Sequence, residues 1–86
     1  MVYQVNFTAG AARQLRKLPE SIRHRLAPHL SALAENPRPA GSKKLKGEEG
    51  FRIRVGDYRI LYELDDEASR VLVVRVGHRR EVYRQR

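Results

Sequence analysis

Three arginines recur in one short stretch of the chain at a spacing that could hold an anion. Arg52 and Arg54 alternate with apolar residues, and Arg59 follows the dipeptide Gly56-Asp57. A guanidinium group keeps its positive charge and donates two parallel hydrogen bonds to the oxygens of a phosphate or a carboxylate. The type and spacing of these residues therefore suggest a site for a phosphate group.

The same alternation predicts the elements that position these arginines. Residues 51–55 are typical of a strand with one buried face, Gly56-Asp57 of a two-residue turn, and residues 58–64 of the returning strand. This turn places Arg54 directly opposite Arg59, and two like charges at such a position are unfavourable unless an anion lies between them. We expect helices to cover the apolar face of the two strands and to leave the arginine side open.

Two interpretations of this open side are possible. In the first, the arginines and Glu63 only keep an ordinary solvent-exposed sheet face soluble. In the second, the arginines converge with Arg75 of the next strand and with cations near the end of the sequence on one phosphate site. The convergence favours the second interpretation. The additional cations are Arg79, Arg80, Arg84 and Arg86.

Two helices are expected before these strands. Residues 2–7 alternate as a first strand, and Thr8 is a suitable N-cap for a helix whose apolar residues recur as far as Leu18. Pro19 ends this helix, and the second helix is expected from about Glu20 to Glu35. The link between the two helices is therefore very short, which favours an antiparallel helix hairpin.

The later part of the sequence changes from helical spacing to alternation. Residues 40–50 predict a polar loop, residues 71–76 a central strand, and residues 81–83 a short last piece. The predicted fold is α+β, with an N-terminal strand and an antiparallel helix hairpin packed on one face of a small, mainly antiparallel sheet. We expect residues 1–86 to form a single domain.

The composition limits the classes of protein to consider. The chain has 86 residues, a formal net charge of +8 and no cysteine, which excludes a disulfide-stapled module and a thiolate metal site. No apolar run is long enough to span a membrane and no signal peptide is recognised, so a cytoplasmic protein is expected. Arginine outnumbers lysine by 14 to 4, a ratio that fits either phosphate recognition or the codon bias of a G+C-rich genome.

Other chemistry-bearing residues give weaker signals. His24 and His29 are five residues apart on the second helix and face different directions, so we expect no metal site. Glu48 and Glu49 are adjacent and point apart, which makes them poor general acid–base partners. The sequence also has no glycine-rich phosphate loop of a nucleotide-binding type, and we expect no cofactor.

Two residues near the end of the sequence are of more interest. Gly77 allows the chain to bend where His78 and Tyr83 leave the sheet, so either side chain could reach the open face. Tyr83 could equally be a packing residue whose hydroxyl lies in water.

Four segments, which together span nearly the whole chain in order, resemble the RelE/ParE toxin superfamily. They are FRIRVGDYRILYE at 51–63, LAENPRP at 33–39, KKLKG at 43–47 and RVGHRREVY at 75–83, the last of which resembles the RelE branch. The resemblance implies a RelE-like fold of the microbial-ribonuclease type and a toxin that pairs with an acidic, RelB-like antitoxin. It further implies a metal-independent endoribonuclease that cuts messenger RNA in the ribosomal A site and so inhibits translation.

The resemblance also implies which residues act. The RNA 2′-hydroxyl attacks the adjacent phosphate to leave a 2′,3′-cyclic phosphate, and fixed guanidinium groups stabilise the growing negative charge. Arg54 and Arg59 would stabilise that phosphate, Arg79 the leaving 5′-oxygen, and Tyr83 would stack on a base. The catalytic set implied is Arg52, Arg54, Arg59, Arg79 and Tyr83, and the RNA-binding set is Lys43, Lys44, Lys46, His78 and Arg80.

Two questions stay open at the level of sequence. Arg52 and Arg54 stand where the best-known RelE toxin has lysines, and arginine is a poor general base, so the proton acceptor could be His78, ribosomal RNA or the substrate. The second question is the activity itself. A ParE-like inhibitor of DNA gyrase without nuclease activity is the main alternative, and an inactive toxin that still binds its antitoxin is another.

Overall fold

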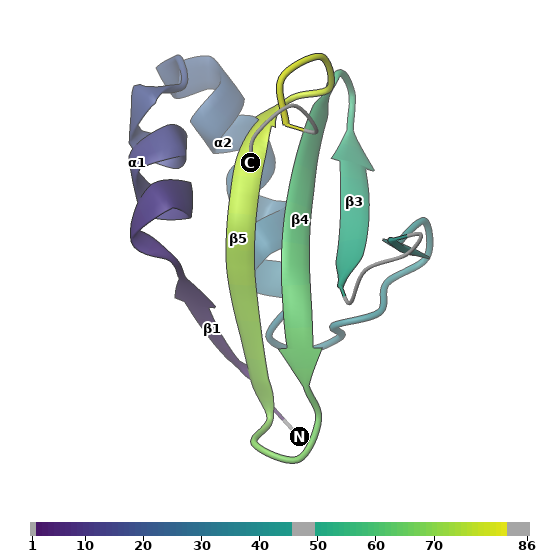
Figure 1. Cartoon of the computed structure of the whole chain (residues 1–86). Coiled ribbons are helices and arrows are strands. Elements are labelled where there is room, and N and C mark those ends of the chain that lie inside the picture. Colours follow the sequence, from purple (N-terminus) through teal and green to yellow (C-terminus); the bar gives the residue numbers. More distant parts are fainter. Residues whose placement is uncertain (1, 46–49, 83–86) are drawn as a thin grey trace.

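The computed structural model describes residues 2–45 and 50–82 and has two helices on one face of a five-stranded sheet (Figure 1). β1 runs parallel to β5, and all other neighbouring strands are antiparallel. This is the predicted α+β fold. The strands are β1 (Gln4–Phe7), β2 (Lys43–Lys44), β3 (Phe51–Val55), β4 (Tyr58–Asp65) and β5 (Arg70–His78), in the spatial order β1-β5-β4-β3-β2.

The two helices are α1 (Ala9–Lys17) and α2 (Glu20–Ala32). Thr8 caps α1 as predicted, because its Oγ1 accepts a hydrogen bond of 3.0 Å from the backbone N–H of Ala11. The prediction that α2 reaches Glu35 is wrong: the N–H groups of residues 33–35 bond to carbonyls three residues back, which tightens the last turn and ends the helix at Ala32. Neither helix in the described part of the chain is long and apolar enough to cross a membrane.

The predicted hairpin register is confirmed. Val55 lies opposite Tyr58 and Arg54 opposite Arg59, on either side of the two-residue turn. Gly56 has a φ of 61° in this turn, a left-handed conformation that glycine adopts without strain. The hairpin therefore presents its arginines on a single face.

Three predicted boundaries near this hairpin are wrong. Within the expected loop over residues 40–50, β2 pairs with the start of β3. β5 does not stop before Gly77 but continues to His78, because β4 pairs with it over the full length from Tyr58. Residues 79–82 form turns instead of the start of a last strand, and Tyr83 lies outside the described residues.

A β-bulge in β5 decides which side chains reach the open face. Leu61 pairs with Arg75, but the next residue of β4, Tyr62, pairs with Val73, so Val74 has no partner on β4. A bulge of this kind reverses the alternation of the strand beyond it. Arg75 consequently lies on the open face, whereas strict alternation after the buried Val73 would have turned it into the core.

The hydrophobic core lies between the helix hairpin and the sheet. The apolar face predicted for β3 and β4 packs there against α2 and against the apolar side of β5. Burial of these side chains supplies most of the stabilisation available to so small a domain. The largest fully buried side chains are Tyr62, Leu26, Leu33, Ile60, Val71 and Val73.

Candidate functional site

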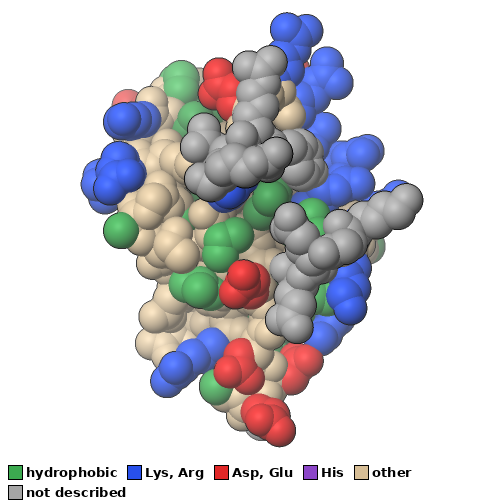
Figure 2. Space-filling model, viewed as in Figure 1, with side chains coloured by type: hydrophobic (Ala, Val, Ile, Leu, Met, Phe, Trp, Pro, Cys, Tyr) green, Lys and Arg blue, Asp and Glu red, His purple; other side chains and the backbone are tan. Residues whose placement is uncertain are grey.

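The open face of the sheet carries basic side chains in two cross-strand rows. One row consists of Lys43, Arg52, Leu61 and Arg75 on β2 to β5, and the other of Arg54, Arg59 and Gly77 on β3 to β5. Figure 2 views this face and shows Lys and Arg side chains gathered over the β3 side and the hairpin end. We call the five cations of these rows the arginine face: Lys43, Arg52, Arg54, Arg59 and Arg75.

Arg59 is the most enclosed cation of the arginine face, with only 9% of its surface exposed. Its Nη1 donates hydrogen bonds of 3.0 Å to the main-chain carbonyls of Gly56 and Tyr58. No carboxylate among the described residues forms an ion pair with it. The two carbonyls fix the direction of the guanidinium group, and its charge has no counter-ion among the described residues.

The expectation that Arg59 is an exposed side chain is therefore wrong. The chain turns back after β5, and the side chain of Val82 is buried with only 3% exposed. A β-carbon at Gly77 would lie 3.9 Å from that of Val82, so Val82 rests on the residue next to Arg59 in its row. The main-chain carbonyl of Val82 also accepts a hydrogen bond of 3.1 Å from Arg75 Nη1.

Arg52 and Arg54 complete the centre of the arginine face. Arg52 is half-buried and Arg54 is exposed, and neither side chain has a hydrogen-bond or ion-pair partner within residues 2–45 and 50–82. Arg54 stands directly across the hairpin from Arg59. The like-charge pair foreseen from the sequence is present, and no described carboxylate relieves it.

Arg79 lies beside the hairpin turn at the edge of the arginine face. Its backbone N–H donates to the carbonyl of Asp57 at 2.7 Å, and its Nε is 3.8 Å from Asp57 Oδ1. Both side chains are exposed, so this long ion pair holds the guanidinium group only weakly. A cation that we did not predict is near the same turn: Arg25 Nη1 of α2 would lie 3.1 Å from a β-carbon at Gly56.

Arg25 could not have been found from the helical pattern alone. It is exposed and precedes the buried Leu26 on α2. Its approach to the hairpin turn depends on how α2 docks on the sheet.

His78 does not join the arginine face. It is paired with Tyr58, and their rings meet edge to face with centroids 5.5 Å apart, on the side of the sheet that the helices cover. Its Nδ1 accepts a hydrogen bond of 3.1 Å from the backbone N–H of Arg80, so the neutral ring carries its proton on Nε2. His78 lines a cleft of about 480 Å³ beside Gln14 and Lys17 of α1.

The predicted RNA-binding lysines are divided by the structure. Lys43 shares the face of Arg52, whereas Lys44 pairs with Phe51 and lies on the opposite side of the sheet. Both are exposed, as is Arg80. Lys46, Tyr83, Arg84 and Arg86 lie outside the described residues, and within the described ranges no group of three His, Cys, Asp or Glu side chains could hold a metal ion.

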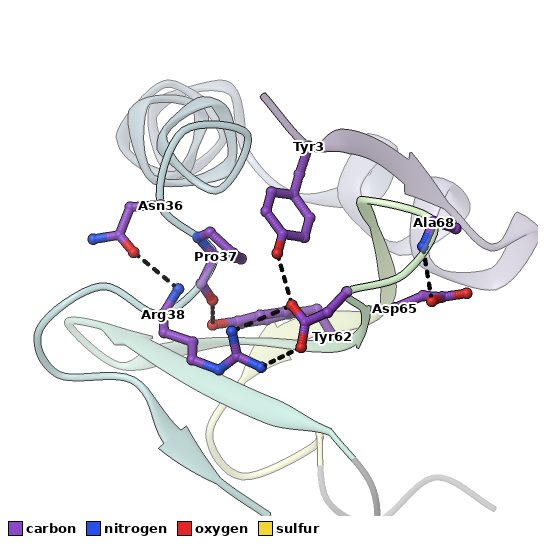
Figure 3. Close-up of polar contacts among 8 residues, drawn as sticks. Tyr3, Asn36, Pro37, Arg38, Tyr62, Asp65 and Ala68 are labelled. Carbon is purple, nitrogen blue, oxygen red and sulfur yellow. Dashed lines mark hydrogen bonds and ion pairs between the residues drawn. The ribbon is translucent and has the colours of Figure 1, made fainter. Parts of the chain in front are cut away.

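At the opposite end of the sheet, a different arginine is fully paired (Figure 3). Asp66 accepts a hydrogen bond of 2.8 Å from Arg38 Nη2 on one oxygen and of 2.7 Å from the Tyr3 hydroxyl on the other. These two hydrogen bonds, first that of Arg38, lower the pKa of the Asp66 carboxyl, and the bond to Asp66 raises the pKa of Tyr3. We call these three residues the Asp66 clamp.

The Asp66 clamp ties the segment after α2 to the sheet. The guanidinium carbon of Arg38 lies 5.4 Å from the ring centroid of Phe51, the first residue of β3. Beside it, the buried hydroxyl of Tyr62 donates a hydrogen bond of 2.7 Å to the carbonyl of Pro37, and burial is the main cause that raises the pKa of Tyr62. These contacts position β3 without using the arginine face.

The fold and this face define a class of small α+β proteins in which a helix hairpin backs a sheet and the open side of the sheet carries unpaired cations. The family model described as "ParE toxin of type II toxin-antitoxin system, parDE" matches residues 5–83. The chain is 38% identical to Toxin RelG of Mycobacterium tuberculosis, over 99% of this chain and 100% of the relative. It is 34% identical to mRNA interferase toxin RelE of Escherichia coli K12, over 96% and 92% of the two chains.

Solved structures agree with these relatives. A RelBE toxin–antitoxin complex from Mycobacterium tuberculosis contains a chain that matches with a TM-score of 0.81 and 37% identity, covering 91% of this chain and 92% of that one. The isolated RelE toxin of Escherichia coli matches with a TM-score of 0.79 and 33% identity, covering 95% and 92%. This chain belongs to the RelE/ParE superfamily of type II toxin–antitoxin toxins, as its sequence motifs suggested.

Proposed function

We propose that this protein is the toxin of a RelBE-type pair and that it cuts messenger RNA in the ribosomal A site. One observation carries the proposal: Arg52, Arg54 and Arg59 converge on the open face of the sheet with no described carboxylate to neutralise them. Such a site has its lowest free energy when an anion occupies it. The name mRNA interferase, borne by the relative from Escherichia coli, supports RNA as the source of that anion.

In the proposed reaction, the RNA 2′-hydroxyl attacks the adjacent phosphorus and the bond to the 5′-oxygen breaks. The products are a 2′,3′-cyclic phosphate and a free 5′-hydroxyl. The phosphate gains negative charge during attack, and Arg59, already oriented by two carbonyls, stabilises that charge without having to reorganise. Arg54 acts from across the hairpin. Arg79 stabilises the negative charge of the leaving 5′-oxygen, which then takes a proton from water, and Tyr83 orients a base.

The proton of the attacking 2′-hydroxyl leaves by a route outside the arginine face. Arginine holds its proton too firmly to be a general base, and the arginine face contains only cations. His78 packs against Tyr58 on the helix-covered side of the sheet, which argues against it as the acceptor. We therefore propose that the ribosome or the substrate accepts the proton, and that this chain supplies charge stabilisation and positioning.

The proposed partner that restrains the toxin is an acidic, RelB-like antitoxin. The net charge of +8 favours rapid electrostatic association with such a partner. Complexes of related toxins with RelB antitoxins support this choice. Coverage of the arginine face by the antitoxin would block the phosphate site.

The family-model match keeps a second function under consideration, because the model describes ParE toxins. A ParE-like toxin would inhibit DNA gyrase by binding and would cut no RNA. In that case the unpaired arginines would serve a protein or DNA contact.

One experiment separates the two functions. Purified toxin is added to a cell-free translation reaction and, in parallel, to a gyrase supercoiling reaction. We expect translation to stop and primer extension to map new RNA ends inside ribosome-bound codons, while supercoiling continues. Intact messenger together with inhibited supercoiling would establish the ParE-like alternative and refute the nuclease.

A further inference from the structure

A hollow of about 310 Å³ lies on the open face at the end remote from the hairpin turn. It spans three strands, because Glu63 of β4 pairs with Leu72 of β5 and Leu72 pairs with Asn6 of β1. Arg70 of β5 also lines it. Figure 2 shows acidic side chains on this lower part of the face, beside a few hydrophobic and basic ones, whereas Lys and Arg side chains are most numerous at the β3 side.

The side chains of the hollow are free to bind a ligand. Asn6, Glu63 and Arg70 are exposed, and none of these three has a side-chain hydrogen bond or ion pair with another described residue. Leu72 is half-buried and offers an apolar surface between them. Asp65, a second carboxylate, also lines the hollow. The hollow thus combines two carboxylates, one guanidinium group, an amide that both donates and accepts, and an apolar surface.

This chemistry selects a nucleobase and rejects a phosphate. The two carboxylates, Glu63 and Asp65, outnumber the single cation Arg70 and disfavour a phosphate, but a carboxylate accepts hydrogen bonds from the amino groups of cytosine, adenine and guanine. Uracil has no amino group, and its N3–H lies between two carbonyl oxygens that would repel the carboxylate. The Asn6 amide can pair with a donor and an acceptor on a base edge, and the apolar surface of Leu72 suits the face of a base.

The position of the hollow relative to the arginine face supports the same ligand. Residues on one face of a strand recur at about 7 Å, so Glu63 follows Leu61 of the first basic row by about 7 Å and Arg59 by about 13 Å. All three residues lie on β4, and no strand of the described residues lies between them. A single-stranded RNA with a phosphate at Arg59 would therefore carry a neighbouring base over the hollow.

We propose that this hollow is a subsite for an unpaired nucleobase next to the scissile phosphate, and that Glu63 and Asn6 favour a base with an amino group over uracil. The inference rests on the proposed RNA cleavage for its place in the reaction. The binding of a base is independent of that proposal, because binding can be measured without any cleavage.

The decisive experiment is a binding titration that uses uncleavable probes. Tetradeoxynucleotides of dA, of dC and of dU are titrated into the toxin, and amide chemical shifts report both affinity and location. We expect dA and dC to bind more tightly than dU and to shift the amides of Asn6 and Glu63. Glu63→Leu, which removes the hydrogen-bond acceptor, should reduce the preference over dU by about fivefold or more. Equal affinities for the three probes, or shifts confined to the arginine face, would overturn the subsite.

A matched control distinguishes a specific contact of Glu63 with a base from the general effect of losing one negative charge. Glu67 lies in the exposed turn between β4 and β5 and does not line the hollow. Glu67→Leu changes the net charge as Glu63→Leu does, so it should leave the preference for dA and dC intact. If both variants lose the preference equally, long-range charge explains it and Glu63 makes no specific contact. A base preference without any cleavage of ribosome-bound RNA would refute the proposed nuclease and leave the base site standing.

Discussion

Arg38 and Arg59 lie near opposite ends of β4 and are held in opposite ways. Arg38 is exposed, yet Asp66 pairs with it at 2.8 Å and Phe51 lies beneath it. Arg59 is nearly buried, yet its Nη1 contacts only two main-chain carbonyls. Burial of a cation without a carboxylate costs free energy. We infer that Arg38 has a structural role and is neutralised by Asp66, whereas Arg59, which has no ion-pair partner among the described residues, binds an anionic ligand.

The largest expected effect is that of a substitution that removes one arginine of the like-charge pair in the hairpin. Arg54→Ala should slow cleavage of ribosome-bound RNA by about 100-fold, the size found when one donor to a charged transition state is removed. The variant should fold normally, because Arg54 is exposed. Single-turnover cleavage and circular dichroism measure the two effects.

Arg13→Ala is the control for that experiment. Arg13 is an exposed cation on α1, so its loss changes the net charge equally without touching the arginine face. A rate near that of the wild type is expected. If Arg13→Ala slows cleavage as much as Arg54→Ala does, the total charge and not the arrangement of the face governs the rate.

A smaller effect concerns stability, and it should have opposite signs at the two arginines. Arg59→Met replaces an unpaired, nearly buried cation by an apolar side chain of similar length, so we expect the free energy of unfolding to rise by about 1 kcal/mol. Arg38→Met removes the partner of Asp66 and should lower the melting temperature slightly, since the pair is exposed. Denaturant titration of both variants tests the contrast. A fall in stability for both would mean that Arg59, too, has a structural role.

The smallest effect is the pH dependence of the Asp66 clamp. The lowered pKa of Asp66 means that its contribution to stability is present above the pKa of about 4 in the unfolded chain. It is lost as the pH falls through the lower pKa of the folded state. The raised pKa of Tyr3 adds a contribution that is present below about pH 10 and is lost as the pH rises through the folded pKa.

Melting temperatures of the wild type and of Arg38→Met between pH 2 and pH 7 would show this dependence. The small advantage of the wild type should shrink towards low pH and weaken at high salt. A constant difference across this range would show that the packing of Arg38 on Phe51, and not its ion pair, stabilises the end of the sheet.

Local patterns in the sequence predicted much of the candidate site. A two-residue turn leaves one register for β3 and β4, and that register alone brings Arg54 opposite Arg59. The apolar alternation of the same strands predicted which face the helices cover. These features depend on neighbours within a few residues, so no tertiary information was needed.

The features that the sequence could not predict all depend on contacts between distant residues. Arg59 is buried, and Val82 folds back on Gly77, the residue beside Arg59 in its row; no pattern around Arg59 signals this. The sequence predicts Arg75 on the open face and the structure confirms it, but no local pattern signals the bulge at Val74 that places it there. His78 faces the helices because β5 extends past Gly77, where a bend was expected from the glycine. In each case tertiary pairing overrode a local preference.

We propose that the unpaired cation Arg59, and not positive charge in general, serves the cleavage of messenger RNA. Arg59→Met and Arg38→Met remove the same charge from opposite ends of the sheet, so their single-turnover rates on ribosome-bound messenger test that claim most directly. We expect Arg59→Met, which should be folded and more stable than the wild type, to cleave about 100-fold more slowly. Arg38→Met should cleave at a rate close to that of the wild type. A folded Arg59→Met protein that cleaves as fast as the wild type would contradict the claim.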